Sequence, residues 1–184
     1  RWVSDGESAA VAGDWLAVTE NIWTHSGIQQ GTEVNNVVRF ERDGKPIRQR
    51  EGTVSKLEVR TLDTATGEVE ATADLTPAYA QGAGVGGWQR SVHFADRRLR
   101  VEDTFRVSSG TRAVFQVNLP VRPEIDGAGA RAGKLHIKVI EPADARLEVL
   151  EWSSLDAAEF RSGWRLDVSG SGERFVVELA EGGR

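Results

Sequence analysis

The sequence predicts an all-β protein, an antiparallel sandwich of two sheets with roughly 11–13 strands. Helical periodicity is nearly absent, and short runs with period-two alternation of apolar and polar residues recur along the chain. Turn-forming pairs such as Asp43-Gly44, Thr66-Gly67 and Ser109-Gly110 separate these runs. Many short alternating runs divided by such turns are typical of a β-sandwich or barrel.

The clearest predicted element is a hairpin of residues 86–94 and 98–107 around a short polar turn. Pairing across that turn places Phe94 opposite Leu99, Val92 opposite Val101, Arg90 opposite Asp103 and Trp88 opposite Phe105. Arg90 and Asp103 then lie on the apolar face, where an unpaired charge is costly. We therefore expect Arg90 and Asp103 to form a buried structural ion pair.

The other strands follow from the same alternation, and they are expected at residues 14–20, 33–42, 54–62, 68–75, 111–119, 134–140, 146–152, 163–168 and 173–179. In residues 111–119, for example, Phe115 and Val117 alternate with Gln116 and Asn118, which predicts one apolar face and one solvent-facing face. Stacking the apolar faces of two sheets would bury them. Residues 155–160 are expected to form a short helical turn, and residues 80–87 and 126–133 flexible loops.

Composition sets limits on the class of protein. The chain has 184 residues, 39% hydrophobic and 28% charged, and it has a net charge of -5 and no cysteine. We expect one domain over residues 1–184, no nucleic-acid partner and no disulfide. No apolar run approaches the roughly 20 residues that cross a bilayer, so we expect no membrane partner. Because the chain begins at Arg1 and has no methionine, we expect it to be part of a longer chain.

An ordered set of motifs carries a family resemblance. These motifs are Asp74-Leu75-Thr76, Ala78-Tyr79, a Gly-rich loop, Trp88-Gln89-Arg90-Ser91-Val92 and Leu99-Arg100-Val101-Glu102-Asp103. Together they resemble the C-terminal β-domain of heparinase II/III-like polysaccharide lyases, over roughly residues 33–119. The resemblance implies a two-sheet supersandwich, a missing N-terminal α-helical toroid domain, and β-elimination of an anionic polysaccharide that contains uronic acids. It also implies a periplasmic or secreted protein without a cofactor.

The resemblance also implies a substrate-binding set. Related lyases show a His-Asn pair entering a strand, followed by Asp-Gly and a Gln. Here Asn35 stands in the place of the His, whereas Asn36, Gly44 and Gln49 keep the pattern. Asparagine cannot act as a general base near neutral pH, but its amide can hydrogen-bond a carboxylate or a hydroxyl. We therefore expect Asn35, Asn36 and Gln49 to bind substrate, and the chain to be inactive alone.

Proton transfer has two candidate residues, His25 and Tyr79. His25 lies in an apparent loop beside Trp23, which we expect to provide a sugar-stacking surface. Tyr79 is the only tyrosine and precedes the Gly-rich loop, where it could instead be an aromatic plug at the rim of the sandwich. The three histidines lack metal-ligand spacing, so we expect no metal site. A non-catalytic carbohydrate-binding module and a purely structural β-sandwich stay open as alternatives.

Overall fold

The fold is an antiparallel β-sandwich, and we analyse it in a computed structural model that describes residues 32, 35–50, 53, 55–151 and 163–181. Within these ranges two sheets contain all the strands, and the short 3-10 helix η3 (Thr76–Ala78) lies between β4 and β5 in the sequence. No helix in the described ranges has the length and apolar character needed to span a membrane. The predicted fold class is thus confirmed. The expected strand at residues 14–20 and helical turn at residues 155–160 lie outside the described residues.

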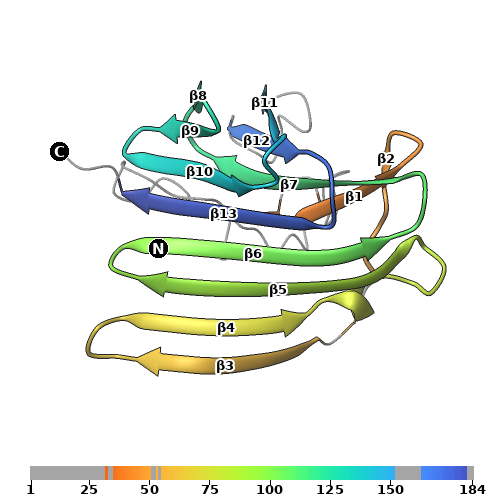
Figure 1. Ribbon diagram of the computed structural model, residues 1–184, viewed down its shortest axis with the longest axis horizontal. Helices are drawn as coiled ribbons and strands as arrows, with labels where there is room; N and C mark the ends of the chain where they lie inside the picture. The colour runs from red at the N-terminus through yellow and green to blue at the C-terminus, as the bar shows by residue number, and fades with distance from the viewer. Residues whose placement is uncertain (1–31, 33–34, 51–52, 54, 152–162, 182–184) are drawn as a thin grey trace.

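The larger sheet has eight described strands in the order β3-β4-β5-β6-β13-β10-β9-β8 (Figure 1). Their bounds are β3 Lys56–Asp63, β4 Glu68–Asp74, β5 Val85–Ala95, β6 Arg98–Val107, β13 Arg174–Glu181, β10 Leu135–Glu141, β9 Gly129–Ala132 and β8 Glu124–Asp126. The smaller sheet has the order β11-β12-β7-β1-β2 among the described strands. Its bounds are β11 Arg146–Glu151, β12 Trp164–Ser169, β7 Thr111–Leu119, β1 Val38–Arg42 and β2 Lys45–Pro46.

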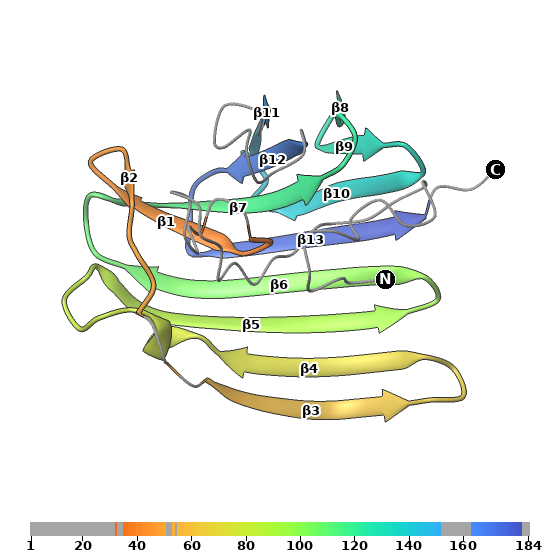
Figure 2. The same cartoon turned by 180° about the vertical axis from the view of Figure 1, so that it is seen from behind.

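The core lies between the two sheets where β1 and β7 run alongside β13 (Figures 1 and 2). Phe115 of β7 meets Phe175 of β13 with ring centroids 6.0 Å apart. Phe40 of β1 meets Trp88 of β5 and Phe105 of β6 edge-on, at 5.6 and 5.5 Å. These aromatic contacts cross from one sheet to the other, so they fix the stacking of the sandwich as well as filling it.

The register of the central hairpin is confirmed. Strands β5 and β6 pair Phe94 with Leu99, Val92 with Val101, Arg90 with Asp103 and Trp88 with Phe105. A bulge between Val85 and Gly87 ends the regular pairing near the Gly-rich loop. The alternation of side chains and the opposite charges of one pair were therefore sufficient to identify this register.

The prediction of a flexible loop at residues 126–133 was wrong. Gly127 and Ala128 form a turn, and β8 and β9 pair on either side of it. Ala130 and Ala132 are buried, and a Cβ at Gly129 would lie 2.3 Å from the carbonyl oxygen of Ile137 on β10. Small residues are needed here because the backbone of β9 packs closely against β10. At the other expected loop, residues 80–87, the strand already begins at Val85.

Two further expectations need correction. The expected strand at residues 33–42 begins only at Val38, because residues 35–37 bend. On the polar face of β7, Arg112 is exposed, but Gln116 and Asn118 do not meet solvent and are fully buried. Apolar side chains are instead exposed on the terminal strand β3, where Leu57 and Leu62 are 64% and 68% exposed. Figures 1 and 2 show β3 and β4 extending beyond the smaller sheet, which explains that exposure.

Candidate functional site

The candidate site is centred on the bend that leads into β1, and hydrogen bonds from both sheets hold this bend. The carbonyl oxygen of Asn36 accepts a hydrogen bond from Nη1 of Arg90 on the larger sheet, at 2.7 Å. The side-chain Oδ1 of Asn36 accepts one from the backbone N–H of Asn118 on the smaller sheet, also at 2.7 Å. Asn36 therefore bridges the two sheets.

Arg90 is fixed by Asp103. Its Nε and Nη2 atoms donate to the two carboxylate oxygens of Asp103 at 2.8 and 2.9 Å, and Nε1 of Trp88 donates to the same carboxylate at 2.7 Å. Asp103 is fully buried, and the side chain of Arg90 is 15% exposed. Because the bidentate pair already compensates the guanidinium, Arg90 acts here as a support for Asn36. This is the ion pair expected from the cross-strand register.

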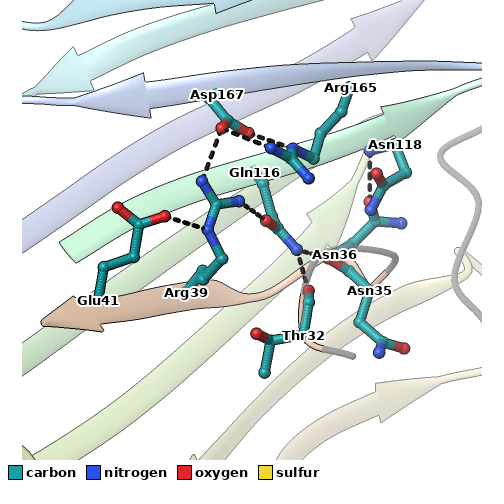
Figure 3. Close-up of polar contacts among 9 residues, drawn as sticks. All are labelled: Thr32, Asn35, Asn36, Arg39, Glu41, Gln116, Asn118, Arg165 and Asp167. Carbon is teal, nitrogen blue, oxygen red and sulfur yellow. Dashed lines mark hydrogen bonds and ion pairs between the residues drawn. The ribbon is translucent and has the colours of Figure 1, made fainter. Parts of the chain in front are cut away.

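A buried polar network lies on the other side of the bend (Figure 3). The side-chain amide of Gln116 donates to the carbonyl oxygens of Thr32 and Asn35, and its Oε1 accepts from Nη1 of Arg39. Arg39 continues the network through Nη2 to Oδ2 of Asp167, at 2.7 Å. One buried amide on β7 therefore connects the bend to a group of charged residues.

The charges of that group compensate one another. Asp167 accepts from Arg39 and also from Arg165, whose Nε lies 2.6 Å from Oδ1. Glu41 accepts from Nε of Arg39 at 2.6 Å. Burial alone would lower the pKa of the Arg39 guanidinium, but the hydrogen bonds and charges of Asp167 and Glu41 outweigh that effect and raise its pKa. Two arginines, Arg39 and Arg165, thus face the carboxylates of Asp167 and Glu41.

The network determines how Asn35 is presented. Gln116 binds the backbone carbonyl of Asn35, whereas the side chain of Asn35 points away from the network (Figure 3). Further backbone hydrogen bonds within the bend join Asn35 N–H to the oxygen of Thr32 at 3.2 Å and Val37 N–H to the oxygen of Asn35 at 3.0 Å. The backbone that carries Asn35 is therefore held in place, and its side chain is directed away from Gln116.

Tyr79 follows η3 and is an aromatic plug with one polar atom. It is 4% exposed, and its ring lies 5.4 Å from that of Phe40 and 6.1 Å from that of Trp88. Its hydroxyl accepts a long hydrogen bond from Nε2 of Gln49, at 3.5 Å. Burial raises the pKa of Tyr79 to about 12, although Gln49 and the charge of Arg90 oppose the shift. The phenol is therefore protonated near neutral pH, a form that can donate a proton but not accept one.

The structure brings several of the expected site residues into one region. Asn35 and Asn36 lie on the bend, Arg90 links the bend to Asp103, and Tyr79 meets Gln49. Trp23 and His25 lie outside the described residues, so their predicted roles stay predictions. His93 and His136 are exposed on strands, as the sequence predicts. Among the described residues, no group of three His, Cys, Asp or Glu side chains could hold a metal ion.

Sequence reasoning missed the buried polar network. Arg39 lies between Val38 and Phe40, and Asp167 lies between Leu166 and Val168; all four neighbours are fully buried. A single charge inside a buried apolar run is a signal for a buried partner of opposite charge. That signal was present in β1 and β12, but it does not identify which charge pairs with which.

The fold and the hydrogen-bonded bend define this chain as a two-sheet antiparallel β-sandwich with a polar site where the chain enters β1. No family model and no curated protein matches the chain. A solved structure of a heparinase III gene product with methylated lysines is similar in fold, with a TM-score of 0.54 at 14% identity. The similarity covers 81% of this chain and 24% of that one. The chain therefore has a heparinase-like fold and spans about a quarter of the length of that protein.

Proposed function

We propose that this chain is the β-sandwich part of a polysaccharide lyase that acts on uronic-acid-containing glycans by β-elimination. The observation that carries the proposal is the heparinase-like fold, in which the bend holding Asn35 and Asn36 is hydrogen-bonded to both sheets. Its partners would be an anionic polysaccharide and an N-terminal helical domain of the same protein. A periplasmic or secreted location belongs to the same proposal.

The chemistry of the site supports a binding role within that reaction. β-Elimination requires hydrogen bonds or a cation at the uronate carboxylate, a base that removes the neighbouring proton, and an acid at the leaving oxygen. The amides of Asn35 and Gln49 can donate hydrogen bonds to a carboxylate or a hydroxyl. The phenol of Tyr79, with a pKa of about 12, is in the form needed for the acid. None of these groups is a base near neutral pH, so we expect the chain to be inactive alone.

A non-catalytic carbohydrate-binding module is the second candidate. It is favoured by two features of the same site: Asn35 stands where related lyases show a histidine, and the hydroxyl-bearing ring of Tyr79 is almost completely buried. Such a module would still use Asn35 and Gln49 to bind sugar. The two candidates therefore differ in reaction and in partner domain, not in the place where the glycan would bind.

An assay of the isolated chain tests the proposal. We expect amide chemical-shift changes at Asn35, Asn36 and Gln49 on titration with short uronic oligosaccharides, and Asn35→Ala should remove them. His136→Ala, an exposed substitution on β10, is the matched control and should leave binding unchanged. No unsaturated uronate should accumulate from heparan sulfate or alginate, as followed by ultraviolet absorbance. Product formation that scales with the amount of chain would contradict the inactive assignment, and the absence of any shift would favour a structural module.

A further inference from the structure

A hollow of about 690 Å³ lies on the outer face of the larger sheet, on the opposite side of β5 and β6 from the core. We call it the outer-face groove. Its polar lining residues are Asp74, Thr76, Gln89, Thr104, Arg106, Glu173 and Arg174. Its volume falls within the range of roughly 300–1,000 Å³ that is usual for small-ligand sites. The groove shares no lining residue with the bend that carries Asn35 and Asn36.

Strand pairing arranges four of these residues in a row. Asp74 pairs with Gln89, Gln89 with Thr104, and Thr104 with Arg174, across β4, β5, β6 and β13. Neighbouring strands lie about 4.8 Å apart, so the row extends over roughly 14 Å. A rigid sheet thus presents a line of polar side chains with the length of a short oligosaccharide.

Several side chains of the groove are available to a ligand. Gln89, Thr104 and Arg106 are exposed, and their side chains make no hydrogen bond or ion pair anywhere in the described part of the chain. Arg174 is different, because its guanidinium is held by Glu102 and by Glu141, the latter at 3.0 Å. Asp74, at the other end of the row, accepts a hydrogen bond from the backbone N–H of Thr76 at 3.0 Å. The groove therefore has two engaged ends and a middle whose donors and acceptors are not engaged.

A glycine shapes the floor. A Cβ at Gly87 would lie 3.3 Å from Nε and Nη2 of Arg106, so the guanidinium of Arg106 lies across the bare backbone of β5. Arg106 and Gly87 are cross-strand partners, which explains the contact. The side chain of Arg106 therefore forms one wall of the groove beside the row of polar residues.

The charges of the groove indicate which ligands fit it. Asp74 and Glu173 are carboxylates, which accept hydrogen bonds, whereas Arg106 donates and the amide of Gln89 does both. The charge of Arg174 is already compensated by two glutamates. Two carboxylates facing one uncompensated arginine disfavour a polyanion such as nucleic acid or a densely sulfated glycan. Hydroxyl groups, which donate and accept, match this set of side chains.

We infer that the outer-face groove binds a hydroxyl-rich saccharide segment of low charge density. The vicinal hydroxyls of the sugar would donate to Asp74 and Glu173 and accept from Arg106 and Gln89. The groove lies on the reverse side of the strands that carry Trp88, Arg90 and Asp103, and the inference does not depend on a lyase reaction. It assigns a second carbohydrate contact to this sheet.

An NMR titration of the full chain with cellohexaose tests the inference, and hexameric oligomannuronate serves as the charged probe. We expect cellohexaose to shift the backbone amides of Gly87, Gln89, Thr104 and Arg106. The double variant Gln89→Ala/Arg106→Ala should weaken binding at least tenfold. Arg98→Ala is the matched control, because Arg98 is an exposed arginine on the same face of the same strand, and it should bind as the unmodified chain does.

Three results would overturn the inference. In the first, neither probe shifts the backbone amides of the groove. In the second, Arg98→Ala weakens cellohexaose binding as much as the double variant does. In the third, the groove binds only the charged probe, and salt abolishes that binding. Shifts confined to Asn35, Asn36 and Gln49 would overturn the groove and support the proposed function. Shifts confined to the amides of the groove would support saccharide binding in the groove and would remove support for sugar binding at the bend.

Discussion

Replacing Arg90 with methionine should strongly destabilise the sandwich. Methionine has a similar length and keeps the apolar contacts of the side chain, whose Cζ lies 5.6 Å from the ring centroid of Trp88. The substitution removes two of the three hydrogen bonds that side chains of the described residues donate to the carboxylate of Asp103, and it removes the hydrogen bond to the carbonyl of Asn36. Asp103 then remains as a fully buried carboxylate with Nε1 of Trp88 as its remaining donor in this cluster.

The magnitude follows from that uncompensated charge. Breaking a buried pair by removing one partner costs roughly 3–5 kcal/mol of the free energy of unfolding. For a chain of this length, each kcal/mol lowers the melting temperature by roughly 2–4 °C, so the expected decrease is roughly 6–20 °C. Arg90→Met/Asp103→Leu should cost clearly less than the sum of the two single substitutions, because no buried charge remains.

Urea unfolding followed by tryptophan fluorescence measures these free energies, since the chain contains six tryptophans. The matched control is Arg100→Met, which breaks the ion pair with Glu178 at 3.1 Å. Those side chains are 36% and 22% exposed, so that substitution should cost at most about 1 kcal/mol. A cost below about 1 kcal/mol for Arg90→Met, or additive single costs, would refute the reasoning.

Three other predictions follow from single residues. Gln116→Glu keeps the side-chain shape but loses the donor to two buried carbonyls, so we expect the free energy of unfolding to fall by roughly 1–3 kcal/mol and the amides of the bend to exchange faster. Unchanged amide exchange would contradict the idea that Gln116 holds the bend. Leu166→Ala, at a fully buried position, should lower the free energy of unfolding by about 2–5 kcal/mol. Leu57→Ala, at a position 64% exposed, should change it by about 0.5 kcal/mol or less. Similar unfolding free energies for the two variants would be evidence against the described core. The single tyrosine, Tyr79, should titrate by ultraviolet absorbance near pH 12 in the folded chain and near pH 10 in denaturant. Because its pKa is raised in the folded chain, its contribution to stability is complete below pH 10 and is lost as the pH rises toward 12. A titration midpoint near pH 10 in the folded chain would contradict its burial.

The central hairpin could be predicted from the sequence because its signals agree with one another. Alternation defines two faces in β5 and β6, and only one register places Arg90 opposite Asp103. The hairpin of β8 and β9 gives no such signal. Gly129 and Ala130 have little side chain to alternate, and β9 is defined by its close packing against β10.

The buried polar network could not be predicted for a different reason. Alternation places Gln116 and Asn118 on the face opposite the core, and a period-two pattern assigns that face to solvent. Whether the face is covered depends on residues far away in the chain, since Gln116 meets Thr32 and Arg39, more than 70 positions earlier. Periodicity is a local signal, so it cannot detect this contact.

The same long-range contacts make the candidate site dependent on the closed sandwich. Asn36 receives a hydrogen bond from Arg90 of the larger sheet and another from Asn118 of the smaller sheet. The smaller sheet also holds the bend through the side-chain amide of Gln116, whereas the larger sheet contributes the hydrogen bond from Arg90. Any substitution that loosens the stacking of the sheets should therefore disturb the bend before it unfolds the strands. Weaker saccharide binding at Asn35 after a core substitution would then reflect sheet packing, and binding measurements at this site have to be read beside the unfolding free energy of the same variant.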